Sequence, residues 1–118
     1  MDELVGRLVA NVGVDRTVAE KAVGIILAFL LKEGPTDKVQ ALIGQMPGAE
    51  AAVQEASSGG GFGIGGIMGV GTRLMAAGLG MDQMQGVTRE LIAYAREQAG
   101  EDAVGEIVGS IPGLGQFI

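Results

Sequence analysis

The sequence predicts an all-α domain, a compact bundle of about six or seven short helices, and three observations support this prediction. Apolar residues recur at the helical spacing of i, i+3, i+4 and i+7, whereas the alternation typical of a β-strand does not extend over any useful length. Glycines and prolines stand at the ends of the periodic segments. The length of 118 residues suits a single domain, which we place at residues 1–118.

Three helices are expected in the N-terminal part of the chain. The first ends at Gly13, and the third runs from a cap at Thr36 to Pro47-Gly48. Between them, the second contains an uncharged apolar run from Ala22 to Leu31, which is ten residues long. Because a bilayer span needs roughly 20 apolar residues, we expect this run to form a helix that is buried on most sides.

The pattern of these three helices recurs further along the chain. The matched segments are Arg7-Leu8 with Arg73-Leu74, Gly13-Val14-Asp15 with Gly80-Met81-Asp82, and, at a constant offset of 65 residues, 37–48 with 102–113. We therefore predict pseudo-duplicated three-helix units in two repeat-like halves, residues 1–56 and 67–118. The alternative is a chance similarity between ordinary amphipathic helices.

The middle helices of the two units are expected to differ in burial. The second one carries Arg89, Glu90, Arg96 and Glu97, whereas the first is almost free of charge after Lys21. Interleaved charges of both signs are typical of a solvated helix face, which we favour here over an acid–base pair. The two units should therefore pack asymmetrically.

A glycine-rich joint, residues 57–66, is predicted between the two halves. Within it, Gly61 to Gly66 fit the phosphate-binding pattern G-x-G-x-x-G, but that pattern requires a preceding buried strand, and residues 51–58 are polar and helical in character. We favour a flexible joint up to about residue 63 and a helix that starts near Gly65. Contact of this segment with a membrane or lipid is the alternative.

The composition excludes most familiar active sites. The chain has no His, no Cys and no Trp, which removes imidazole and thiol chemistry, disulfides and the usual zinc, haem and iron–sulfur ligands. We expect no enzyme activity, no cofactor and no metal site. A net charge of −6 argues against nucleic-acid binding, and the acidic N-terminus lacks the features of a secretory signal, so we expect a cytoplasmic protein.

Two arginines, Arg7 and Arg73, occupy the same position in the predicted repeat, each beside apolar residues. We expect their stems to lie on the apolar surface and their guanidinium groups to reach water or the C-terminus of a helix. A role in ligand binding is the less favoured alternative.

Several segments carry a resemblance to a known group of proteins. They are Val-Gly-Val-Asp at 12–15, Ala-Glu-Lys-Ala-Val-Gly at 19–24, Met-Pro-Gly at 46–48, the central Gly/Met-rich stretch and, most specifically, residues 99–117. They resemble a family of small bacterial proteins known only as a domain of unknown function. The resemblance extends over nearly the whole chain and implies an all-helical fold, but it implies no activity, ligand or catalytic residue.

The leading hypothesis is a non-enzymatic module for protein–protein interaction or self-association, with a protein partner or a homo-oligomer. It depends on the missing catalytic residues and on methionines near the joint, because methionine adapts to many binding surfaces. The candidate interaction surface consists of Phe62, Ile64, Ile67, Met68, Arg73, Met75, Met81 and Met84.

Two other classes remain open. In the first, a membrane-associated or lipid- or apolar-ligand-binding protein, the uncharged stretch from Ala56 to Gly71 inserts into a membrane or lines a lipid cavity, although the acidic net charge disfavours attraction to a lipid surface. In the second, an enzyme uses only carboxylates, Arg and Lys, with Mg²⁺ as its metal.

Overall fold

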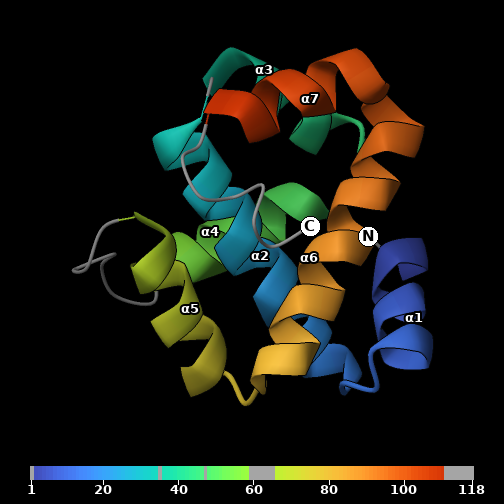
Figure 1. Ribbon diagram of the computed structural model, residues 1–118, viewed down its shortest axis with the longest axis vertical. Helices are drawn as coiled ribbons and strands as arrows, with labels where there is room; N and C mark the ends of the chain where they lie inside the picture. Colours follow the sequence, from blue (N-terminus) through green and yellow to red (C-terminus); the bar gives the residue numbers. More distant parts are fainter. Residues whose placement is uncertain (1, 35, 47, 59–65, 111–118) are drawn as a thin grey trace.

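The computed structural model describes residues 2–34, 36–46, 48–58 and 66–110, and of residues 2, 33, 57, 58 and 66–69 it describes the backbone alone. The described residues form seven α-helices and no strand, which confirms the predicted all-α fold (Figure 1). The helices are α1 (Asp2–Asn11), α2 (Arg16–Glu33), α3 (Thr36–Gly44), α4 (Ala49–Ser58), α5 (Gly66–Ala76), α6 (Met81–Ala99) and α7 (Glu101–Ser110).

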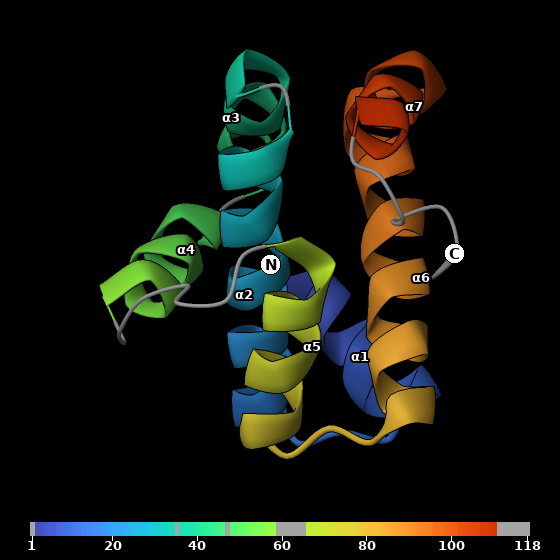
Figure 2. The same cartoon turned by 60° about the vertical axis from the view of Figure 1, so that its left-hand side comes forward.

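The two long helices, α2 and α6, form the centre of the bundle. Both α1 and α5 contact this central pair, and α3 and α7 lie against each other at one end of the molecule (Figure 1). Seen from the side, α3 continues the column of α2 and α7 continues the column of α6, while α4 covers the outer side of α2 (Figure 2). The helices therefore bury apolar residues against their neighbours in one core.

The burial of α2 follows from its uncharged sequence, as predicted. All residues from Ala22 to Leu30 are buried. At Gly24 the backbone of α4 approaches so closely that an added Cβ would lie 2.4 Å from the carbonyl oxygen of Ala52. A residue without a side chain is needed at this crossing, because any Cβ would overlap the backbone of α4.

The other middle helix, α6, has the solvent-exposed face that its charged residues predict. Arg89, Arg96 and Glu97 are exposed, whereas Val87 and Leu91 are at most 1% exposed. The turns that precede and follow the long helices depend on glycine, because Gly13 and Gly100 have φ angles of 83° and 92°. Thr36, the predicted cap, is the first residue of α3, and its hydroxyl donates a hydrogen bond to the Leu31 carbonyl oxygen at 3.3 Å.

The helix lengths recur in the order that the predicted duplication requires. Helices of 10, 18 and 9 residues (α1, α2, α3) are matched by helices of 11, 19 and 10 residues (α5, α6, α7). Within the part of the chain that the structure describes, no helix after α7 corresponds to α4, so the two sets of helices differ in this element. The recurrence agrees with a duplication without demonstrating one, so the pseudo-duplication stays a prediction.

The predicted glycine-rich joint, residues 57–66, overlaps the ends of two helices. Helix α4 continues through Ser58, and α5 begins at Gly66, so both ends of the predicted 57–66 segment are helical. The remaining residues of the joint, 59–65, lie outside the described part of the chain.

Candidate functional site

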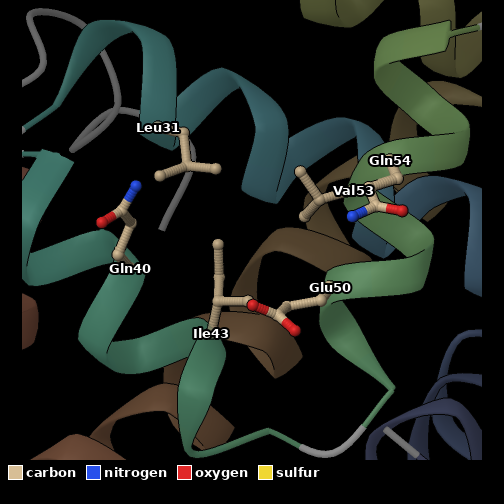
Figure 3. Close-up of a pocket in the computed structure, with 6 residues that line it drawn as sticks. All are labelled: Leu31, Gln40, Ile43, Glu50, Val53 and Gln54. Atoms are coloured by element: carbon tan, nitrogen blue, oxygen red, sulfur yellow. The ribbon is translucent and has the colours of Figure 1, made fainter.

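A groove lies between the C-terminal end of α2 and the helices α3 and α4, with a volume of about 480 Å³. Its lining residues, shown as sticks in Figure 3, are Leu31 from α2, Gln40 and Ile43 from α3, and Glu50, Val53 and Gln54 from α4. We call this feature the α2–α3–α4 groove.

The walls of the groove are apolar and its rim is polar. Ile43 and Val53 point toward the space from opposite helices and are 6% and 8% exposed, and Leu31 closes the end nearest α2 (Figure 3). The side chains of Gln40, Glu50 and Gln54 are exposed around them. Such a lining accepts one or two apolar side chains and offers amide and carboxylate groups to the polar atoms next to them.

The groove exists because the chain turns sharply between α3 and α4. Met46, in the turn, is 1% exposed, and Ala49, the first residue of α4, is fully buried, so the turn is fixed in the core. Both α3 and α4 pack on α2, but they contact each other less extensively. The groove lies where these two helices diverge on the surface of α2.

A second cavity, of about 300 Å³, lies between α2, α4 and α5. Its lining residues are Lys21, Ile25, Ala52, Glu55, Ala56 and Arg73. Arg73 is half-buried, and its Nη2 donates a hydrogen bond to the carbonyl oxygen of Ala56 at 2.6 Å. Ala56 belongs to the last turn of α4, so this arginine reaches the C-terminal end of a helix, as expected from the sequence.

Arg7, at the matching position of the predicted repeat, joins α1 to α6. Its Nη1 and Nη2 donate hydrogen bonds to the two carboxylate oxygens of Glu97 at 2.6 and 3.0 Å, and its guanidinium carbon lies 5.6 Å from the centre of the Tyr94 ring. The hydrogen bond from Arg7 lowers the pKa of the Glu97 carboxyl and raises the pKa of Arg7 itself. These two parallel hydrogen bonds between a planar guanidinium group and a carboxylate connect α1 to α6.

Of the predicted surface residues, the structure describes the side chains of Arg73, Met75, Met81 and Met84, and these differ in burial. Met75 and Met81 are 61% and 67% exposed, on either side of the turn between α5 and α6, whereas Met84 is 7% exposed and belongs to the core. Arg73 lines the second cavity. Ile67 and Met68 belong to α5, but their side chains lie outside the described structure, as do Phe62 and Ile64 entirely.

None of the groove residues was among the predicted ones. Gln40, Glu50 and Gln54 stand on the polar sides of amphipathic helices, where their types are ordinary. They differ from other exposed polar residues only because α2, α3 and α4 meet beside them, and no local sequence signal predicts where these three helices meet.

Within the described ranges, no group of three or more acidic side chains is placed to hold a metal ion. Among the helices of the described part of the chain, none combines the length and the apolar character that a membrane crossing requires.

Comparison of the chain with known protein families, curated proteins and solved structures finds no match. The resemblance to a bacterial family of unknown function therefore stays a prediction.

Proposed function

We propose that this protein is a non-enzymatic protein-interaction module whose α2–α3–α4 groove receives a short segment of a partner protein. The observation that carries the proposal is the lining of the groove, in which apolar walls are surrounded by two amides and one carboxylate. Its volume of about 480 Å³ lies within the range of roughly 300–1,000 Å³ that is usual for binding pockets.

The charge of the protein indicates which segment fits. Glu50 is an acidic group on the rim, and the whole chain has a net charge of −6. Both favour a partner segment that places one or two apolar side chains next to a Lys or Arg, because opposite charges increase the association rate and exclude acidic competitors.

The first step of the test identifies the partner by photo-crosslinking in the native cell. A photoreactive residue is placed at Gln40 or Gln54 on the groove rim, and at Ala93, an exposed position on α6, as a control. We expect both groove positions, and not Ala93, to give one common crosslinked partner. Crosslinks that are equally frequent at all three positions would contradict the proposal, and a crosslink between two copies of the chain would replace it with self-association.

The second step measures the affinity of the partner segment for two charge-reversed variants. Glu50→Lys and Glu101→Lys change the same charge in the first turn of a helix, α4 and α7 respectively, but only Glu50 lines the groove. We expect Glu50→Lys to weaken binding by about fivefold and Glu101→Lys to change it by less than about twofold. Equal losses would mean that net charge, and not the groove, determines the affinity.

A further inference from the structure

The second cavity, between α2, α4 and α5, has a charge pattern unlike that of the whole protein. The chain carries 14 acidic and 8 basic residues, but the cavity is lined by two cations, Lys21 and Arg73, and one anion, Glu55. The described lining residues therefore carry a net charge of +1, in a protein whose net charge is −6. Two cationic side chains at one cavity favour an anionic ligand over a cationic one.

The other described lining residues are apolar. Ile25 is 6% exposed and Ala56 is 9% exposed, and Ala52, one turn before Ala56 on α4, also meets Gly24 of α2. These side chains form a wall against which a short hydrocarbon chain can be removed from water. The volume of about 300 Å³ is at the lower end of the range for ligand pockets, which limits the ligand to a small molecule.

The position of the Arg73 guanidinium is fixed by its hydrogen bond to the Ala56 carbonyl oxygen at 2.6 Å. Arg7, at the matching position of the predicted repeat, binds both carboxylate oxygens of Glu97. Guanidinium groups suit carboxylates because their N–H groups match the spacing of the two oxygens. Lys21 is a second cation in the lining of the same cavity.

We infer that this cavity binds a small monocarboxylate with a short apolar chain, with the carboxylate next to Lys21 and Arg73 and the chain on Ile25 and Ala52. The single net positive charge of the lining suits a monoanion, because Glu55 repels a second negative charge. This site is separate from the α2–α3–α4 groove, with which it shares no lining residue.

The test is a titration of the full-length protein followed by NMR, with hexanoate as the probe and hexanol and hexylammonium as controls of the same chain length. We expect hexanoate to shift the resonances of Ile25, Ala52 and Ala56 in a saturable way, with an affinity at least about fivefold higher than that of either control. Shifts that do not saturate, or equal affinities for the three probes, would overturn the inference.

Variants of Lys21 separate the cavity from the overall charge. Lys21→Gln removes an exposed cation from the cavity, and Lys32→Gln removes an exposed cation from the same helix outside it. We expect Lys21→Gln to weaken hexanoate binding by about threefold, Lys21→Arg to retain it, and Lys32→Gln to leave it within experimental error. Equal weakening by both glutamine variants would show that the anion does not bind at this cavity.

Discussion

At the scale of single residues, Arg7 and Arg73 show how one position of the predicted repeat acquires two different partners. Arg7 binds the Glu97 carboxylate on α6, and Arg73 binds the Ala56 carbonyl oxygen at the end of α4. The sequence predicts a cation beside an apolar stripe in both cases. The partner of each depends on which helix the fold places opposite, and α4 lies beside only one of the two.

The bond between Arg7 and Glu97 predicts a pH-dependent contribution to stability. The pKa of the Glu97 carboxyl is lowered in the folded protein, so the folded state binds this proton less tightly than the unfolded chain does. Its contribution is therefore present at neutral pH and is lost as the pH falls from the ordinary pKa of 4.5 through the lower folded value. We expect Glu97→Gln to reduce the melting temperature at pH 7 and to have a smaller effect at pH 3.

The matched control for this measurement is Glu101→Gln, which removes an exposed carboxylate that does not bind Arg7. Its effect on the melting temperature should not follow the same pH dependence. Because the Arg7–Glu97 pair is partly exposed, high salt should also diminish the difference between wild type and Glu97→Gln. An effect of Glu97→Gln that is equal at pH 3 and pH 7 would mean that the carboxylate charge is not involved.

Met84 shows that a signal present in the sequence was given too little weight. It precedes Val87 and Leu91 by three and seven residues, which is the spacing of one helix face. The structure buries all three together. Periodicity therefore indicated a core position, whereas the general adaptability of methionine led to its assignment to an interaction surface.

At the scale of helices, the close crossing of α2 and α4 depends on Gly24. An added Cβ would lie 2.4 Å from the Ala52 carbonyl oxygen and 2.8 Å from its carbonyl carbon, which are backbone atoms that a rotamer change does not move. We expect Gly24→Ala to destabilise the protein by about 1–3 kcal/mol in urea unfolding, because the overlap outweighs the gain of up to about 1 kcal/mol in helix propensity.

The same substitution at Gly105, in the middle of α7, serves as the control. A Cβ at this exposed position would meet nothing within 4 Å, so only the propensity term remains. We expect Gly105→Ala to stabilise the protein by about 0.5–1 kcal/mol. Changes of the same sign in both variants would contradict the close approach of α4 to Gly24.

The helices themselves could be predicted from the sequence, but which helices pack against each other could not. Periodic apolar residues and the glycine after them placed the end of the first helix at Gly13, two residues beyond the observed end of α1 at Asn11, because both signals act within one helical turn. The packing of α4 on α2 and of α1 on α6 joins segments that are distant in the sequence. The groove and the second cavity are consequences of that packing, so no residue of the groove was predicted as a site.

At the scale of the whole molecule, the two halves are interleaved rather than stacked. Helix α1 of the first half contacts α6 of the second, and α5 of the second half contacts α2 of the first. Helices α3 and α7 also meet, through an ion pair between Lys38 and Glu106. Each half therefore buries part of its apolar surface against the other, and neither has a complete core of its own.

This interleaving predicts that the halves unfold together. Tyr94 is the chain's single tyrosine, and the chain has no Trp, so intrinsic fluorescence reports on α6 and on the contact of Tyr94 with Arg7. Circular dichroism reports on all helices at once. We expect both signals to follow one urea transition with the same midpoint, because removing either half exposes the core of the other. Two separate midpoints would instead mean that one half retains its helices alone, and that the contacts of α1 with α6 and of α5 with α2 contribute little to stability.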